Sequence, residues 1–150
     1  MERGRVVDII PKQELSWKVS FDIIVFDPST GTYSNVFHFT KDDNRGQHGY
    51  RTPALWITNQ IFLMAFNTDS NMNHYFEKSI ALNKKMNVVM EQVLLSGTTP
   101  TIRIFVDQKL VHQHTHTWIT PFEDVKVYFS DPWYDPANVE VSNFSYVQHS

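Results

Sequence analysis

The chain is 150 residues long, and 41% of its residues are hydrophobic and 14% aromatic, which is enough to build a core within one domain. The formal net charge of -3 and the lack of a long basic run exclude the strongly positive surface that nucleic-acid binding requires. The sequence contains no cysteine, which excludes disulfide bonds, thiolate catalysis and cysteine-ligated zinc sites.

The N-terminal stretch, residues 1–11, is too short and too interrupted for the apolar region of a signal peptide. No apolar run approaches the roughly 20 residues of a membrane-spanning helix, so we expect no membrane insertion. No linker or internal repeat divides the chain, and residues 1–150 are predicted to form a single domain.

Hydrophobic residues alternate with a period of two along most of the chain. Residues 17–25 show this alternation, the turn sequence 27–31 follows, and residues 34–40 are predicted to return beside the first strand. Further strands are predicted, in chain order, at residues 54–58, 60–67, 74–79, 87–95, 101–106, 109–116, 125–130 and 139–147. The best helical candidate, residues 80–90, is weakened by two asparagines and adjacent β-branched residues. About ten short strands separated by turns are typical of an all-β antiparallel sandwich.

Residues 41–53 form a polar loop with two glycines that carries carboxylate, amide, imidazole, phenol and guanidinium groups. Neighbouring sugar hydroxyls need hydrogen-bond donors and acceptors side by side, and these residue types supply both. We therefore predict a ligand-binding role for Asn44, Arg45, His48 and Arg51. The alternative is a solvated connection in which aspartate and glycine only turn the chain.

The loop at residues 130–138 admits three interpretations. Trp133, with the tyrosine after it, could stack on the apolar face of a sugar ring. Asp131 and Asp135 could bind calcium, a possible cofactor, through carboxylate oxygens. The two prolines equally favour a rigid structural corner that buries the tryptophan.

His112, His114 and His116 alternate along a predicted strand, so their rings are expected on one face with neighbours about 6–7 Å apart. A zinc site, an ordinary exposed face with adventitious metal affinity, and a pH-sensitive surface all remain open.

The sequence offers little evidence for catalysis, and an enzyme, either a sandwich glycosidase or a histidine–metal hydrolase, ranks behind the non-catalytic functions as a third hypothesis. A sandwich glycosidase needs two carboxylates alternating on one strand, and Glu91, Glu123 and Asp124 offer no such row. No nucleophile elbow, phosphate-binding loop or dinucleotide fingerprint is present.

Two segments carry a family resemblance. Residues 125–134 read V-K-V-Y-F-S-D-P-W-Y and lead to V-E-V-S-N-F at residues 139–144, while residues 40–44 and 48–54 match an upstream polar element. On these motifs the chain resembles concanavalin A-like, laminin G-like jelly-roll modules of invertebrate extracellular proteins. One departure is Tyr50, which stands where the family has an acidic residue.

A looser similarity, to galectins, rests on residues 38–40 with Asn44 and Arg45, but the tryptophan that stacks under galactose in galectins has no clear counterpart. These resemblances imply an extracellular or secreted protein with glycan or glycoprotein partners. The pattern Asn143-Phe144-Ser145 would accept N-glycosylation in such a protein.

Two functions follow from these observations. The leading hypothesis is a non-catalytic, lectin-like carbohydrate-binding or adhesion module that holds a glycan through a sheet face and rim loops. The alternative is a structural or protein-interaction domain without sugar binding. Its sandwich face or edge would pair with another chain, including a second copy in a homo-oligomer, through aromatic residues such as Tyr33, Phe37 and Trp56.

Overall fold

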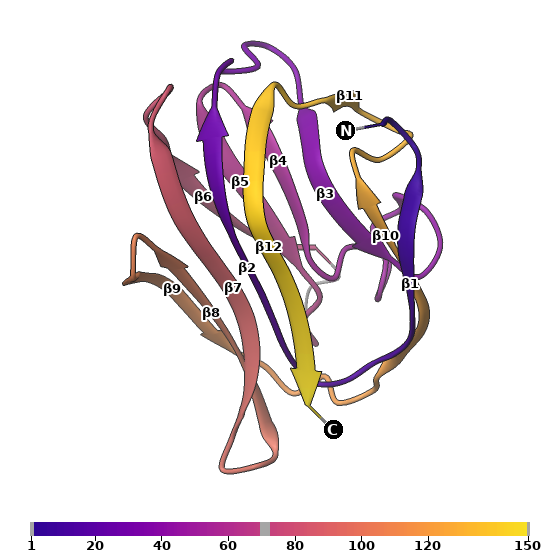
Figure 1. Ribbon diagram of the computed structural model, residues 1–150. Coiled ribbons are helices and arrows are strands. Elements are labelled where there is room, and N and C mark those ends of the chain that lie inside the picture. The colour runs from indigo at the N-terminus through magenta and orange to yellow at the C-terminus, as the bar shows by residue number, and fades with distance from the viewer. Residues whose placement is uncertain (1, 70–72, 150) are drawn as a thin grey trace.

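The computed structural model describes residues 2–69 and 73–149, and these fold into two stacked β-sheets (Figure 1). The first sheet contains β1 (Val6–Gln13), β3 (Ser34–Thr40), β4 (Ala54–Thr58), β5 (Ile61–Phe66), β6 (His74–Ser79), β10 (Phe122–Phe129) and β11 (Asp135–Pro136). The second contains β2 (Ser16–Val25), β7 (Lys85–Leu95), β8 (Thr99–Val106), β9 (Lys109–Thr115) and β12 (Val139–His149). The strand order is β1-β10-β3-β4-β5-β6 in the seven-stranded sheet, with β11 beside β3, and β12-β2-β7-β8-β9 in the five-stranded sheet.

Every one of these strand pairs is antiparallel except the short pair between β11 and β3. The predicted all-β antiparallel sandwich is therefore confirmed. The predicted strands at residues 34–40, 54–58 and 74–79 coincide with β3, β4 and β6. No helix long and apolar enough to cross a bilayer occurs in the described ranges.

The sequence prediction differs from the structure at β1, β11 and residues 80–90. β1 was not predicted from the sequence. It lies at the edge of its sheet and most of its side chains are exposed, so its hydrophobic and polar residues show little alternation. β11 has only two residues, too few to carry a pattern. Residues 80–90 contain a turn and the start of β7 instead of a helix, as their β-branched content favours.

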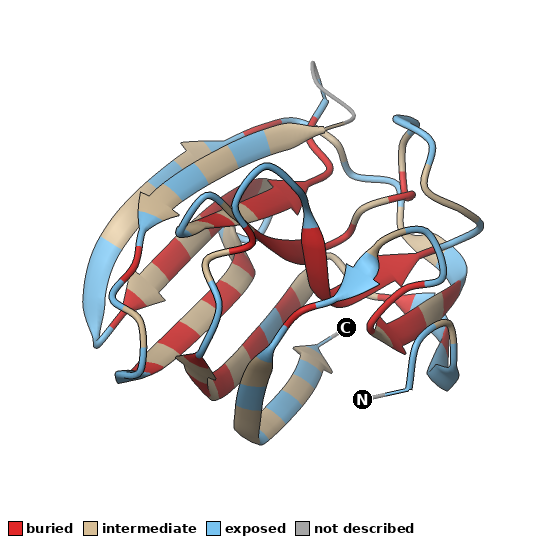
Figure 2. Cartoon of the chain, turned by 90° about the horizontal axis from the view of Figure 1, so that it is seen from above, coloured by how far each residue is buried: buried red, intermediate tan, exposed pale blue. Residues whose placement is uncertain are grey.

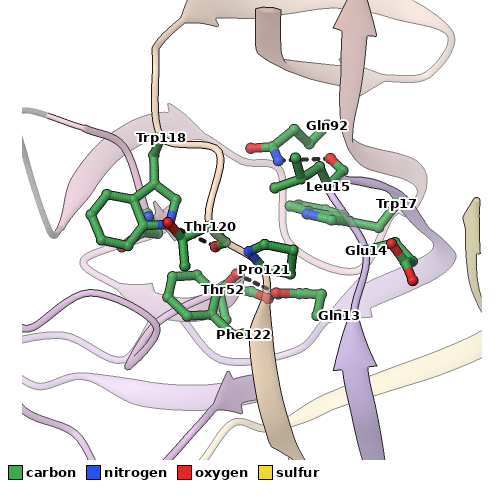
Figure 3. Close-up of a pocket in the computed structure, with 11 residues that line it drawn as sticks. Gln13, Glu14, Leu15, Trp17, Thr52, Gln92, Trp118, Thr120, Pro121 and Phe122 are labelled. Carbon is green, nitrogen blue, oxygen red and sulfur yellow. Dashed lines mark hydrogen bonds between the residues drawn. The ribbon is translucent and has the colours of Figure 1, made fainter. Parts of the chain in front are cut away.

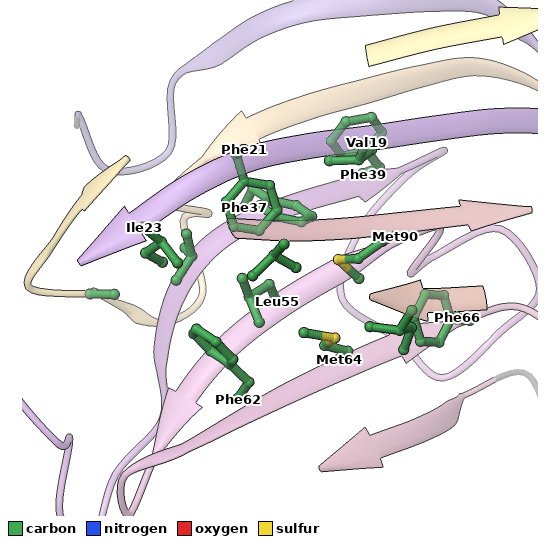
Figure 4. Packing of buried hydrophobic residues seen from close by; sticks show 14 of the residues in the cluster. Val19, Phe21, Ile23, Phe37, Phe39, Leu55, Phe62, Met64, Phe66 and Met90 are labelled. Carbon is green, nitrogen blue, oxygen red and sulfur yellow. The ribbon is translucent and has the colours of Figure 1, made fainter. Parts of the chain in front are cut away.

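The core lies between the sheets and is filled by every second residue of the facing strands, which Figure 2 shows as alternating bands of burial. Along β2, buried positions alternate with partly exposed ones from end to end. Phe21 of this strand packs edge-on against Phe37 of β3, with the ring centroids 5.5 Å apart. Figure 4 shows this contact among the other buried aromatic and aliphatic side chains.

Two strands of the seven-stranded sheet depart from the alternation. All seven residues of β3 are buried, as are the first four of β4. Both faces of these strands must therefore be covered: the inner face by the other sheet and the outer face by chain segments outside the sandwich. The covering segments are the loops at residues 41–53 and 130–138, and the candidate site lies where they meet the sheet.

Candidate functional site

A buried polar pair joins β3 to both covering loops. His38 Nδ1 lies 2.8 Å from Asp131 Oδ2, and both side chains are fully buried. His38 Nε2 lies 2.7 Å from the carbonyl oxygen of Tyr50. Because a carbonyl oxygen can only accept, Nε2 must carry a hydrogen and donate it to that oxygen. The imidazole thereby fixes one loop through its backbone and the other through a carboxylate.

Asp131 also shapes its own loop. Its Oδ1 accepts hydrogen bonds from the amides of Trp133 and Tyr134, at 3.1 and 3.0 Å. Its own amide donates to the side-chain oxygen of Asn35 at 2.8 Å. Such side-chain to backbone bonds stabilise a turn, so this aspartate sets the direction in which the next two aromatic side chains leave the chain.

The two predicted calcium ligands have different partners. Asp131 is committed to the contacts just described, whereas exposed Asp135 lies 3.3 Å from the guanidinium of Arg3. No group of three or more His, Cys, Asp or Glu side chains within residues 2–69 and 73–149 is placed to hold a metal ion. The calcium site stays a prediction without support from its surroundings.

A pocket of about 410 Å³ opens on the outer face of the seven-stranded sheet. Its floor comes from the outward-pointing residues of β4, β5 and β6, because their neighbours in sequence point into the core. Side chains from the loops complete the wall. The lining residues are Tyr33, Arg51, Trp56, Leu63, Tyr75, Glu77 and Tyr134.

Arg51 is the most constrained polar group of the pocket. Its Nη2 donates to the carbonyl oxygen and to Oδ1 of Asn44, at 3.1 and 3.0 Å, and its Nη1 donates to the Tyr75 hydroxyl. The guanidinium carbon lies 5.0 Å from the centroid of the Trp56 ring, a cation–π contact. The Nε of Arg51 and the indole Nε1 of Trp56 are both buried without a hydrogen-bond partner in the described part of the chain.

Asn44 connects the two loops at the pocket rim. Besides accepting from Arg51, its Nδ2 donates to the Tyr134 hydroxyl at 3.0 Å. The Tyr134 ring packs edge-on against Trp56, 5.6 Å away, and against Tyr33, 6.3 Å away. The structure therefore brings two of the five residues predicted to bind ligand, Asn44 and Arg51, together at one pocket.

Of the five predicted ligand residues, Arg51 is among the residues that line the pocket, whereas Asn44 and the other three are not. Arg45 is held by Asp43 at 2.8 Å. His48 stacks on Trp118, with the ring centroids 3.9 Å apart. Trp133 is 36% exposed and packs edge-on against His38. Their roles in sugar binding stay predictions, and each side chain has a local structural partner.

The pocket residues contributed by the sheet were missed as ligand contacts. Trp56, Leu63 and Tyr75 stand on consecutive strands at positions that point away from the core. A sheet with one wet face should carry polar residues there. Large apolar residues at these outward-facing strand positions indicate that this face of the sheet is covered by other segments or binds a ligand. Of the aromatic residues proposed for a self-association surface, Phe37 is fully buried and Trp56 is 2% exposed, so neither can form one.

A second, much smaller cavity of about 20 Å³ lies at one end of the sandwich (Figure 3). There the Gln13 side chain donates to the Thr52 carbonyl and accepts from the Thr52 hydroxyl, both at 2.8 Å. A volume of this size holds about one water molecule. This cavity is therefore too small for a ligand, and the Gln13–Thr52 hydrogen bonds beside it hold the end of the 41–53 loop in place.

The predicted histidine row is divided between two environments. His112 Nε2 lies 3.0 Å from Nε2 of His74 on β6, and the His114 ring stacks on His74 at 4.2 Å. His116 is buried and hydrogen-bonded to Gln92 at 2.8 Å. Burial, followed by the neighbouring histidines, lowers the pKa of His74 to about 4, and burial also lowers the pKa of His112. His74 is therefore neutral at pH 7.

No family model and no curated protein sequence matches the chain. Solved structures do match. The receptor-binding domain of botulinum neurotoxin D superimposes with a TM-score of 0.67 at 10% identity, covering 99% of this chain and 40% of that one. The botulinum neurotoxin type G receptor-binding domain gives 0.63 at 8% identity, covering 98% and 43%. The C/D mosaic serotype domain gives 0.63 at 11% identity, covering 90% and 34%.

At these identities the likeness shows the fold alone. The chain spans between 34% and 43% of the length of these three neighbours, so most of each neighbour has no counterpart here. The comparisons support the β-sandwich, and the finer resemblance to laminin G-like modules stays a prediction.

Proposed function

We propose that this chain is a non-catalytic carbohydrate-binding module whose site is the pocket lined by Arg51, Trp56, Tyr75 and Tyr134. The observation that carries the proposal is the composition of the pocket. Tyrosine rings stand at its rim, with Tyr33 and Tyr75 exposed by 50% and 45%. Hydrogen-bonding groups lie beside them, and a sugar ring presents an apolar face together with a hydroxyl edge.

The size and burial of the pocket support the same class of ligand. A volume of about 410 Å³ lies within the range of small-molecule sites, which is about 300–1,000 Å³. The open rim suits one or two sugar units of a longer glycan better than a fully enclosed molecule. Contacts of this kind are individually weak, so useful affinity would come from several modules or several glycan copies acting together.

The residues that line the pocket favour ligand binding without catalysis. Among the described residues that line the pocket, Glu77 is the one carboxylate. Glycoside hydrolysis by the usual route needs a pair of carboxylates on either side of the scissile bond. The fold neighbours are described as receptor-binding domains, which supports a recognition role in general terms. An extracellular location and glycan or glycoprotein partners are part of this proposal.

A glycan array probed with the purified chain tests the proposal, and the variants separate the two sets of candidate residues. Tyr75→Ala and Tyr134→Ala should weaken binding about tenfold each, because each removes a stacking surface of the pocket. Arg45→Ala and Trp133→Ala are matched controls outside the lining and should bind as the parent chain does. A blank array with and without calcium, or loss of binding in the controls alone, contradicts the proposal.

A second candidate function is self-association along β1. Val6, Val7 and Ile9 of this edge strand are 38%, 45% and 52% exposed. A groove of about 600 Å³ lined by Val7, Phe129 and Phe144 lies beside them. Exposed apolar edge strands readily pair with another chain. Light scattering should then show a dimer that Ile9→Lys dissociates, and a monomer at all concentrations would exclude this function.

A further inference from the structure

We propose that the pocket selects acidic sugars, meaning sugars that carry a carboxylate or a sulfate ester, and that Arg51 is the residue that sets this preference. The inference deepens the proposed function and rests on it.

Arg51 carries a positive charge that forms no ion pair with any acidic side chain among the described residues. The ion pairs of the described residues involve Arg3, Arg5, Lys12, His38, Arg45 and Arg103. Arg51 is absent from them, and its hydrogen bonds go to neutral oxygens of Asn44 and Tyr75. A half-buried guanidinium without a counterion is stabilised when a ligand supplies the anion.

The guanidinium is also fixed in place before any ligand arrives. Asn44 holds it from one side and the Tyr75 hydroxyl from the other, over the Trp56 ring. Tyr134 in turn anchors Asn44. These contacts use three of the five N–H donors of an arginine. Because the group does not have to be ordered on binding, an anion gains the charge-assisted hydrogen bond at little entropic cost.

Unsatisfied donors lie at the same place. Arg51 Nε and Trp56 Nε1 are buried and have no acceptor among residues 2–69 and 73–149. A buried donor left unpaired costs about 1–3 kcal/mol, and native proteins rarely leave two of them in adjacent side chains. An anionic group with several acceptor oxygens, bound against Arg51, brings acceptors to this corner of the pocket.

Glu77 explains why the ligand should be a sugar and not a simple anion. It follows Tyr75 by two residues on β6, so both side chains rise from the same face about 6–7 Å apart. Glu77 makes no ion pair with any other described residue. Its carboxylate can only accept hydrogen bonds, which the hydroxyls on the far side of a sugar ring supply. The anionic group of an acidic sugar can pair with Arg51 while its hydroxyls donate hydrogen bonds to Glu77. A small anion has no hydroxyls to donate, so it would be repelled by the Glu77 carboxylate.

The test uses ligands that differ in a single group. Methyl β-glucuronide, methyl β-glucoside and methyl β-glucoside 6-sulfate are titrated into the chain, with binding followed by NMR at low and at high salt. The glucuronide or the sulfate, or both, should bind at least about tenfold more tightly than the glucoside, the effect expected of one charge-assisted hydrogen bond. High salt should reduce that ratio because it screens the attraction.

Arg51→Gln should bring the ratio of acidic to neutral affinity close to one, while Arg45→Gln, a change of the same charge in the same loop, should leave the ratio unchanged. Equal thermal midpoints for the two variants show that both are folded. Equal or tighter binding of the neutral glucoside by the parent chain would overturn the inference and leave the proposed function standing. If no glycan binds in this titration or on the array, the proposed function fails as well.

Discussion

The outer faces of the two sheets differ in residue type and in burial. On the five-stranded sheet the outward residues are polar or only half-buried, and Glu91 of β7 pairs there with Arg103 of β8 at 3.0 Å. On the seven-stranded sheet the outward residues of β3 and β4 are buried under two loops, and an aromatic pocket opens beside them. The strands of the five-stranded sheet mostly alternate between more buried and more solvent-facing residues, as expected for a sheet with one face in water. Strands β3 and β4 of the seven-stranded sheet do not.

In this sandwich, the outer face that carries buried aromatic residues is a better candidate for a functional site than the outer face that carries polar residues. A polar outward face needs no explanation beyond solubility. Large aromatic residues at outward positions, covered by loops that the buried His38–Asp131 pair holds in place, need a further reason. The proposed ligand recognition would supply that reason, and substitutions on each face test the comparison between them.

The largest effect is expected from Asp131→Ala, which removes the anchor of the covered face. It deprives buried His38 of its partner and frees the amides of Trp133 and Tyr134. Breaking a buried pair from one side costs about 3–5 kcal/mol in the free energy of unfolding, measured by urea denaturation.

The matched control is Asp135→Ala in the same loop. Its exposed pair with Arg3 should contribute less than about 1 kcal/mol. Similar costs for the two aspartate variants would mean that the buried pair does not hold the covered face together.

The second effect compares one outward aromatic residue from each face. Trp56→Ala should destabilise the chain by about 3–4 kcal/mol, since Trp56 is 2% exposed. Phe105 on β8 is half-buried and lies under Arg103, so Phe105→Ala should cost about 1 kcal/mol. Equal costs in urea denaturation would show that the two faces are covered to the same extent.

The third effect concerns the open edge between the sheets, where His74 meets His112 and His114. The pKa of His74 falls from about 6.5 in the unfolded chain to about 4 in the folded one. The unfolded state therefore binds more protons at intermediate pH, so this contribution to stability is complete above pH 6.5 and is lost as the pH falls towards 4.

The slope from His74 alone should reach at most about 1.4 kcal/mol per pH unit. Urea denaturation between pH 7.5 and 4.5 measures it, and His74→Gln should flatten the curve relative to the parent chain. His149→Gln, at the end of β12 and away from this cluster, is the control. A parent curve parallel to that of His74→Gln would contradict the assigned cause.

The sequence predicted the sandwich because ten of the strands repeat the same local signal of alternation bounded by turn residues. It did not predict β1, whose exposed apolar residues carry no alternation. For the candidate site, it singled out Arg51, which lines the pocket, and Asn44, which holds Arg51, because a long polar loop is visible in a single chain. Their role in ligand binding stays a prediction. The sequence could not reveal the pocket floor, since local sequence does not say which strands are neighbours. His38 and Asp131, separated by 93 residues, lie beyond any local pattern.

The four tryptophan indoles offer the most direct test of the central claim, that the pocket over β4, β5 and β6 is the ligand site. In a 15N NMR titration with methyl β-glucuronide and methyl β-glucoside, the indole N–H signal of Trp56 should shift with increasing ligand. The signals of Trp17, Trp118 and Trp133 should stay in place. Shifts at Trp118 or Trp133 with Trp56 unmoved would put the ligand elsewhere and contradict the account.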